Sequence, residues 1–430
     1  MTLKSVTLVL DLPQEIILSI ADFACIRATN ALSQTCRELH NILDPYLWRG
    51  NENNALLWAT EHANQLAARK ALQQGANINA QVPPTDKILF KYKWSEPDHK
   101  VYTQTGATPL TLAIAAGNED MVRFLLQVDG IDVNRRSRED KQQLPPLILA
   151  MLAGDEEMVK LLLGVEDIDT EIREGYSCAS PLMVASMLGL VEMTRILLMY
   201  GAVDPDKGNC FAQSPLFLAT LKTHVEIVAL LIQAGASPHP VSSTLSGPYG
   251  WYAEPVDNAA SSGRPEILRE LIRSPRFDAA KLRSPVEKLQ HSCIRDNQVA
   301  CWRLLFAVGG ANPNWSEDGR TALWWAAAYG HDDVVRSLLA VDGVDVNTVG
   351  RGDTFTREYI ERTRRMGPPG YGEGVTPLIV AAREGHVGVV QLLLAVGAID
   401  VHASDAEGET ALMAAQSRGH EDVVKLIQNS

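Results

Sequence analysis

The stretch TPLIVAAREGHVGVVQLLLAVGA (376–398) decides the fold, because it holds two short helices together with the residues that begin and end them. Thr376 can cap the first helix, and Pro377 suits its first turn, where a missing backbone N–H costs nothing. Gly385 is expected to end that helix. A second helix follows with the apolar residues Val389, Val390, Leu393 and Leu394 at helical spacing, and Gly397-Ala398 is expected to stop it.

The same pattern recurs along most of the chain. A [T/S]-P-L tripeptide or a variant of it starts at residues 108, 145, 180, 214, 254, 284, 321, 376 and 410, and Asn54-Ala55-Leu56 is a weaker first copy. The shared period is near 34 residues. One such unit cannot bury its apolar face alone, whereas stacked copies share a continuous core. The repeat therefore predicts an all-α solenoid of about ten units, with short β-hairpin or turn fingers between them.

This pattern resembles the ankyrin repeat. The likeness is carried by TALWWAAAYGHDDVVRSLLAVDGVDVN (321–347), by the stretch at 376–398 and by TALMAAQSRGHEDVVKLI (410–427). It covers residues 51–430 and is weak between 254 and 310. Insertions are expected at 82–105, 241–253 and 350–373, and in solenoids such insertions map to one face.

The first 50 residues do not fit the repeat and are expected to form three short helices over 10–50. The segments LPQEIILSI (12–20), LSQTCREL (32–39) and LDPYLW (43–48) resemble an F-box. That resemblance implies docking to the Skp-type linker subunit of a cullin–RING ubiquitin ligase. The residues carried over to the docking interface are Leu12, Pro13, Ile16, Ile17, Ile20 and Leu32. The alternative is that these helices only cap the exposed end of the array.

Composition narrows the classes of function. Apolar residues make up 46% and charged residues 21% of the chain, as in a folded protein, and the net charge is −13. An acidic chain does not attract phosphate backbones, so nucleic acid is not expected as a partner. No apolar stretch is long enough to span a bilayer, and the run VTLVL (6–10) is too short for a signal peptide. We expect no membrane association and a cytoplasmic or nuclear location.

No constellation of residues points to catalysis. The six cysteines are scattered, without C-x-x-C or metal-ligand spacing. His331, His386 and His420 recur with the period at the start of second helices and are interpreted as structural turn residues. Trp324 and Trp325 are interpreted as core. We therefore expect no enzyme, no catalytic residue, no metal and no cofactor.

The groove of the array is the expected contact surface for a protein client. The resemblance to ankyrin repeats implies that the two first-helix positions after the small-residue pair face this groove. In the middle repeats these positions are large and apolar. Aromatic residues occupy the adjoining fingertips. Exposed apolar residues with aromatic anchors are typical of protein interfaces. The alternatives are that neighbouring loops cover these residues, or that the register of the repeat is shifted by one residue. The candidate client-binding residues are Leu152, Met187, Leu188, Leu221, Tyr176, Phe211, Trp251 and Tyr252.

The two parts together predict a protein–protein interaction adaptor that recognises substrates for a Skp–cullin–F-box type ubiquitin ligase. Its expected partners are the Skp-type linker subunit, the cullin and an unknown protein client. The alternative is an ankyrin scaffold or transcriptional co-regulator whose N-terminal helices only cap the solenoid.

Overall fold

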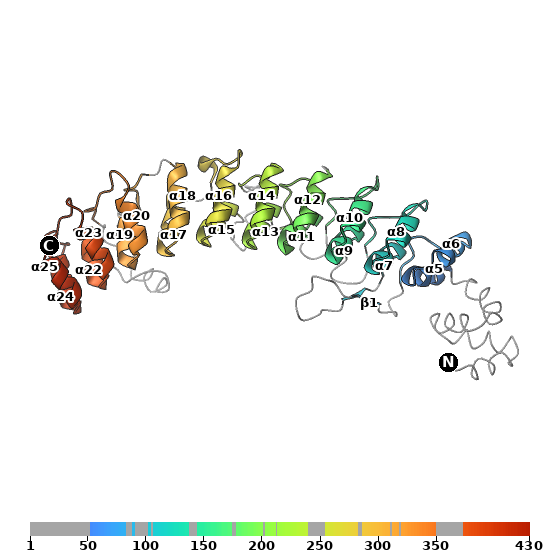
Figure 1. The fold of residues 1–430 in the computed structure, drawn as a ribbon, viewed down its shortest axis with the longest axis horizontal. Coiled ribbons are helices and arrows are strands. Elements are labelled where there is room, and N and C mark those ends of the chain that lie inside the picture. The colour runs from blue at the N-terminus through green and yellow to red at the C-terminus, as the bar shows by residue number, and fades with distance from the viewer. Residues whose placement is uncertain are drawn as a thin grey trace, which may run out of the picture. The chain divides into compact units, whose positions relative to one another are not determined.

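The fold is a series of antiparallel helix pairs, seen here in a computed structural model (Figure 1). The chain divides into two compact units, unit 1 over residues 1–215 and unit 2 over residues 216–430. The expected module at 10–50 lies outside the described residues. The structure describes residues 52–82, 88–90, 102–104, 106–136, 144–173, 178–200, 203–211, 213–239, 254–282, 286–309, 312–317, 320–349 and 373–430.

Unit 1 contains four described helix pairs and one two-stranded antiparallel sheet. The sheet falls in the first expected insertion and aligns Ile88 with Gln104 and Phe90 with Tyr102. The elements are α5 (Glu52–Glu61), α6 (Gln65–Gln73), β1 (Ile88–Phe90), β2 (Tyr102–Gln104), α7 (Pro109–Ala115), α8 (Glu119–Leu126), α9 (Pro146–Ala153), α10 (Glu156–Leu163), α11 (Pro181–Leu188) and α12 (Val191–Met199).

Unit 2 contains the remaining described helix pairs, the first of which begins at the boundary residue Pro215. Its elements are α13 (Pro215–Leu221), α14 (Val225–Gln233), α15 (Pro255–Ser261), α16 (Pro265–Arg273), the 3-10 helix η1 (Ala279–Lys281), α17 (Val286–Arg295), α18 (Val299–Gly309), β3 (Ser316–Glu317), β4 (Arg320–Thr321), α19 (Ala322–Tyr329), α20 (Asp332–Leu339), α22 (Pro377–Glu384), α23 (Val387–Leu394), α24 (Ala411–Arg418) and α25 (Glu421–Gln428).

Most of the first helices begin at the second residue of the repeated tripeptide, as the sequence predicts. Thr376 accepts a hydrogen bond from the backbone N–H of Ile379 at 3.2 Å, and Thr321 accepts one from Trp324 at 3.3 Å. These side chains satisfy a backbone donor that the helix itself cannot pair. The weak first copy at Asn54 differs, since α5 already begins at Glu52.

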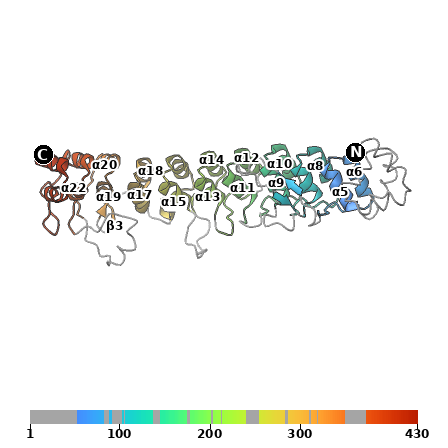
Figure 2. The same ribbon diagram turned by 90° about the horizontal axis from the view of Figure 1, so that it is seen from below.

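Within each unit, first helices pack on first helices and second helices on second helices. In unit 2, α17, α19, α22 and α24 form one layer, and α16, α18, α20, α23 and α25 form the other. Figure 2 shows these two layers, with the connecting loops extending beyond the layer of first helices. The small residues of the first helices, such as Ala326, Ala327, Ala381 and Ala382, are buried and allow this close approach. The core is therefore shared between repeats, as the sequence predicts.

Asparagine side chains join neighbouring fingers. In unit 1, the Asn134 amide donates to the carbonyl of Asp167 at 2.7 Å and accepts from the backbone of Asp169 at 2.8 Å. In unit 2, Asn347 makes the same two bonds with Ala398 and Asp400, each at 2.8 Å. One side chain thus satisfies a donor and an acceptor of the next repeat, which sets the register of stacking.

The recurring histidines also join repeats, which confirms their structural interpretation. His386 Nε2 lies 3.1 Å from the carbonyl oxygen of Ala328, and His420 Nε2 lies 3.1 Å from that of Arg383. Each ring bonds the end of the preceding first helix, whose last carbonyls have no partner within the helix.

Replacing Gly385 by alanine is expected to destabilise the array by about 1–2 kcal/mol, because its φ of 77° is left-handed. A Cβ there would also lie 2.6 Å from Nδ1 of His420 and would disturb the bond from that ring. Urea unfolding followed by far-UV circular dichroism measures the change. Gly397 is the matched control in the same repeat, since a Cβ there meets nothing within 4 Å and its φ is not positive. Equal effects of the two substitutions would contradict this account.

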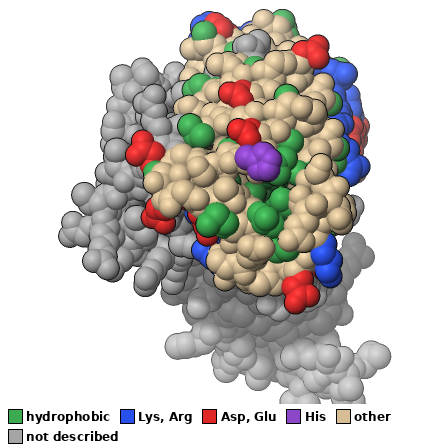
Figure 3. Space-filling model, turned by 90° about the vertical axis from the view of Figure 1, so that its left-hand side faces the viewer, with side chains coloured by type: hydrophobic (Ala, Val, Ile, Leu, Met, Phe, Trp, Pro, Cys, Tyr) green, Lys and Arg blue, Asp and Glu red, His purple; other side chains and the backbone are tan. Residues whose placement is uncertain are grey.

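The last helix pair, α24 with α25, leaves its outer face exposed. Figure 3 looks onto this end of unit 2, where apolar side chains gather around one histidine with acidic side chains nearby. Met413 of α24 is 52% exposed.

Candidate protein-interaction site

The ends of the first helices in unit 1 carry part of the expected client surface. Leu152 in α9 and Met187 in α11 occupy equivalent positions, each six residues after the proline that starts the helix. The two helices pack against each other, so these positions neighbour one another along the stack. Both side chains are half-buried, and Leu188, one position later, is 37% exposed.

The next finger of unit 1 presents a large aromatic side chain. Phe211 is 59% exposed, and its backbone N–H is held by the Asn209 side chain at 3.0 Å. Asn209 also accepts from the backbone of Gln213 at 3.0 Å. A finger whose backbone is tied in this way presents an anchor side chain at low entropic cost to binding.

The other expected client-binding residues lie in unit 2 or outside the described residues. Leu221, the equivalent of Met187 in α13, belongs to unit 2 and is 44% exposed. Tyr176, Trp251 and Tyr252 lie outside the described residues, as do the six expected docking residues Leu12, Pro13, Ile16, Ile17, Ile20 and Leu32.

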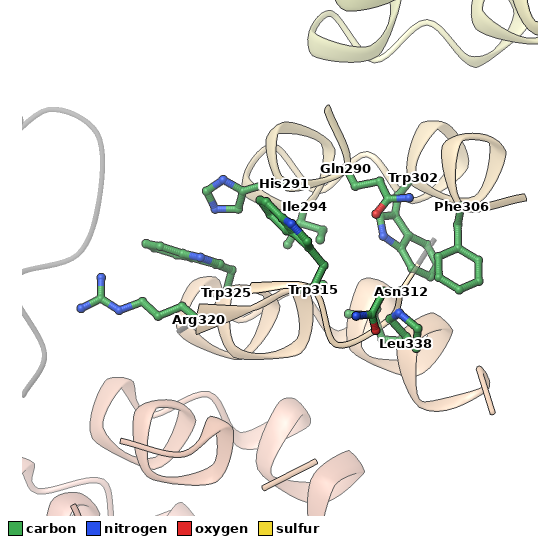
Figure 4. Close-up of a pocket in the computed structure, with 12 residues that line it drawn as sticks. Gln290, His291, Ile294, Trp302, Phe306, Asn312, Trp315, Arg320, Trp325 and Leu338 are labelled. Atoms are coloured by element: carbon green, nitrogen blue, oxygen red, sulfur yellow. The ribbon is translucent and has the colours of Figure 1, made fainter. Parts of the chain in front are cut away.

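Unit 2 contains an aromatic pocket that the sequence analysis missed. It lies between α17, α18, the loop before β3, and α19, and its empty space of about 370 Å³ includes open solvent (Figure 4). Trp325 lines it and is only half-buried, so its interpretation as a core residue needs correction. Trp324, in contrast, is fully buried and donates from Nε1 to the carbonyl of Val375 at 2.9 Å, as a core residue should.

A compositional signal for this pocket was present in the sequence. Four of the eight tryptophans, at positions 302, 315, 324 and 325, fall within one stretch of the chain. Helical periodicity alone assigns Trp325 to a buried face, because it treats all large apolar side chains alike. Only the tertiary structure, in which the loop before β3 and α17 line the same pocket, separates the pocket wall from the core.

The titratable groups near the pocket have structural roles. Cys293 and Cys301 are both buried. A hydrogen bond between the two thiols, followed by burial, raises the pKa of Cys293, and the same hydrogen bond lowers the pKa of Cys301. A protonated buried thiol is a poor nucleophile. Burial also raises the pKa of the Tyr329 hydroxyl, which therefore stays neutral.

Within the residues that the structure describes, no group of three or more His, Cys, Asp or Glu side chains is arranged to hold a metal ion. Among the described helices, none is long and apolar enough to cross a lipid bilayer.

A stack of helix pairs that presents apolar helix ends, exposed fingertips and an aromatic pocket defines a protein-binding repeat protein. The sequence matches the family described as ankyrin repeats (3 copies) over residues 85–174, 147–241, 257–349 and 358–430. The chain belongs to the ankyrin-repeat family. Residues 9–50 match a second family, described as F-box-like, so the chain joins an F-box-like segment to ankyrin repeats.

The chain is similar to parts of longer characterised proteins. The human transient receptor potential cation channel subfamily A member 1 is 28% identical over 256 residues, which are 56% of this chain and 20% of the channel. The nuclear factor NF-kappa-B p105 subunit of Gallus gallus is 28% identical over 202 residues, which are 46% of this chain and 18% of that subunit. The matched region thus spans a fifth or less of these relatives.

Solved ankyrin domains are also similar. The human ASB11 ankyrin repeat domain is 25% identical with a TM-score of 0.41, covering 58% of this chain and 98% of that domain. The ankyrin repeat domain of Bcl-3 is 24% identical with a TM-score of 0.43, covering 59% of this chain and 100% of that domain.

An F-box-like segment followed by ankyrin repeats is the composition of a protein-interaction adaptor. Both families act by binding other proteins and not by catalysis.

Proposed function

We propose that this protein is the substrate-recognition subunit of a Skp–cullin–F-box type ubiquitin ligase. The observation that carries the proposal is the F-box-like match over residues 9–50, which ends directly before the first helix of the array at Glu52. One part of the chain would dock to the ligase and the other would hold the client.

The docking part consists of the apolar residues of the F-box-like segment. Its contact residues are Leu12, Pro13, Ile16, Ile17, Ile20 and Leu32, which face the Skp-type linker subunit, and the linker connects to the cullin. Apolar side chains at the centre of such an interface supply most of its binding free energy.

The client-binding part is the groove and fingertip surface of the array. Leu188 and Phe211 support this assignment, since both are large, apolar and exposed in unit 1. Exposed apolar side chains of this size lower the solubility of a protein, and a bound partner covers them. Leu152, Met187, Leu221, Tyr176, Trp251 and Tyr252 complete the proposed surface.

The function then follows from proximity and needs no chemistry by this chain. Holding the client and the ubiquitin-charged enzyme in one assembly replaces a bimolecular encounter by one at high effective concentration. The rate of transfer to a client lysine rises because of that concentration.

The docking part is tested by affinity purification of the full chain beside an Ile16→Asp, Ile17→Asp variant. Two buried carboxylates in an apolar interface should reduce recovery of the linker subunit and cullin at least tenfold, as judged by mass spectrometry. The client should remain bound. If the linker and cullin fail to co-purify with the unaltered chain, the ligase role is wrong and the protein is a scaffold or co-regulator.

The client-binding part is tested by the reciprocal variant, Leu188→Asp with Trp251→Asp. It should retain the linker subunit and lose the proteins that the docking variant still captures. Circular dichroism of both variants is the control that checks whether they are folded. Unchanged client recovery with this second variant would place the client surface elsewhere on the array.

A further inference from the structure

Two cysteines of unit 1 lie in neighbouring fingers of the array. Cys178 comes two residues before Ser180, which caps α11, and Cys210 comes directly before Phe211 in the next finger. Both are reduced, and a hydrogen bond joins the two thiols. Cys178 is half-buried and Cys210 is exposed. The pair therefore consists of two adjacent sulfurs, one of which is open to solvent.

One arginine fixes the spacing of these two fingers. Nη1 of Arg173 donates to the carbonyl of Cys178 at 3.2 Å, and Nη2 donates to the carbonyl of Gly208 at 3.0 Å. The guanidinium is planar and its donors have a fixed geometry, so it holds together the two backbones that carry the thiols. Asn209 in turn accepts from the backbone N–H of Phe211, on the other side of Cys210. The two sulfurs are therefore held near each other by the backbone of both fingers.

Cys178 stands where other repeats have glycine. Gly106, Gly374 and Gly408 also lie two residues before the residue that caps a first helix, and their φ values are 78°, 83° and 80°. Cys178 has a φ of 52°, in the same left-handed region. A side chain is strained in this conformation, and glycine avoids the strain. A cysteine kept at such a position is a candidate for function, because the fold alone favours glycine.

Exposure separates this pair from the other pair of adjacent thiols among the described residues. Cys293 and Cys301 in unit 2 also share a hydrogen bond, but they are 0% and 1% exposed. Thiols that react with small oxidants are partly exposed, whereas buried structural thiols are inert. Of these two pairs, Cys178 and Cys210 alone combine adjacent sulfurs with access from solvent.

We propose that Cys178 and Cys210 form a reversible redox site, at which exchange with a small disulfide of the glutathione class cross-links the two fingers beside Phe211. The thiolate of Cys210 attacks one sulfur of oxidised glutathione, which forms a mixed disulfide and releases one glutathione thiolate. The thiolate of Cys178 then attacks the Cys210 sulfur, and the second glutathione leaves as the protein disulfide forms. The two cysteines thus give up two electrons and two protons, which leave in two molecules of reduced glutathione.

The cross-link joins consecutive repeats, because α11 and α12 lie between the two cysteines in the chain. It restricts the finger that carries Phe211, a residue of the proposed client surface. The inference goes beyond the proposed function and does not depend on it, since the disulfide forms in the chain by itself, without a linker subunit or a client.

The experiment incubates the full chain with oxidised glutathione, blocks the remaining thiols with N-ethylmaleimide and identifies tryptic peptides by mass spectrometry. Partial desolvation, and then the hydrogen bond with Cys178, raises the pKa of Cys210, so a pH of about 8 is used to populate the reactive thiolate. Arg195 and Lys207 lie between the two cysteines, so trypsin separates them unless a disulfide joins them. We expect the joined peptides to exceed Cys210 bound to glutathione at least tenfold, because the neighbouring thiol is at high effective concentration.

Two controls show that both sulfurs and their exposure are needed. Cys178→Ser removes the second thiol and keeps a side chain of similar size, so Cys210 should carry glutathione at least tenfold more often than in the unaltered chain. The buried pair Cys293 and Cys301 is the matched control within the same sample. Both should react with a second, isotopically labelled maleimide only after unfolding in urea.

Arg173→Met tests whether this arginine positions the fingers. Loss of both hydrogen bonds should slow formation of the joined peptides about tenfold, because the two thiols are no longer held together. Arg195→Met is the control and should cross-link normally, since the exposed Arg195 side chain pairs with Glu192 on α12, 3.4 Å away. Circular dichroism checks that both variants are folded. Normal cross-linking of the Arg173 variant would contradict its positioning role.

The outcomes separate this inference from the proposed function. Separate glutathione molecules on Cys178 and Cys210 would overturn the inference, as would two thiols that stay unreacted in the folded chain. Equal loading of Cys210 with and without Cys178 would also overturn it. Joined peptides that are lost in Cys178→Ser would support it even if no linker subunit or client is captured.

Discussion

Replacing Trp324 by alanine is expected to lower the free energy of unfolding by about 3–5 kcal/mol, one of the largest effects of any single substitution in unit 2. The side chain is fully buried, and its Nε1 donates to the carbonyl of Val375 at 2.9 Å. Val375 lies 51 residues further along the chain, directly before α22. The substitution therefore opens a cavity and also leaves an acceptor of the next repeat unpaired.

Urea unfolding monitored by far-UV circular dichroism measures this change. Trp324→Phe separates the two causes, because it keeps most of the ring volume and loses the hydrogen bond, at a cost of about 1–3 kcal/mol. Met413→Ala, at a residue that is 52% exposed on the equivalent face of α24, is the control and should change stability by less than about 0.5 kcal/mol. A loss below about 1 kcal/mol for Trp324→Ala would contradict the coupling of these repeats through Trp324.

Replacing Arg383 by methionine is expected to cost about 3–5 kcal/mol, because it leaves a buried carboxylate without its counter-ion. Arg383 Nη2 lies 2.9 Å from Oδ2 of Asp405 and also bonds Glu409. The side chains of Arg383 and Asp405 are only 10% and 2% exposed. Burial acts to lower the pKa of Arg383, but the hydrogen bonds to Glu409 and Asp405 outweigh it and the pKa is raised.

A triple variant provides the control for this prediction. Arg383→Met combined with Asp405→Asn and Glu409→Gln removes all three charges together, and it should recover most of the lost stability. Asn at 405 keeps the oxygen that accepts from the backbone of Glu407 at 3.0 Å and of Glu409 at 2.8 Å. Thermal unfolding of the single and triple variants makes the comparison. Equal destabilisation of both would show that the turn geometry matters here and the ion pair does not.

The repeat could be predicted from sequence because its signals are local. Thr376, Pro377 and Gly385 act within one turn of their own positions, as a cap, a first-turn residue and a left-handed stop. The periodic histidines were also interpreted correctly, since a residue that recurs with the repeat makes the same contact each time. The start of α5 was predicted less accurately, because the first repeat lacks the Thr-Pro signal.

The candidate sites were only partly predictable. Leu188, Leu221 and Phe211 are exposed, as their place in the repeat suggests, while Leu152 and Met187 are half-buried by their neighbours. Their role in binding a client stays a prediction. Trp325 was assigned to the core because the period places it on a helix that packs between repeats, and periodicity does not say how completely the neighbours cover it.

The sequence by itself determined the family, the helix pairs and the F-box-like segment, because caps, stops and apolar spacing act over a few residues and repeat. Only the tertiary structure decided which tryptophan is core and which lines a pocket. Trp324 finds the Val375 carbonyl, whereas Trp302 and Trp325 face a space in which their N–H groups have no partner among the described residues. That difference depends on residues from α17 to α20 that meet only when the repeats stack.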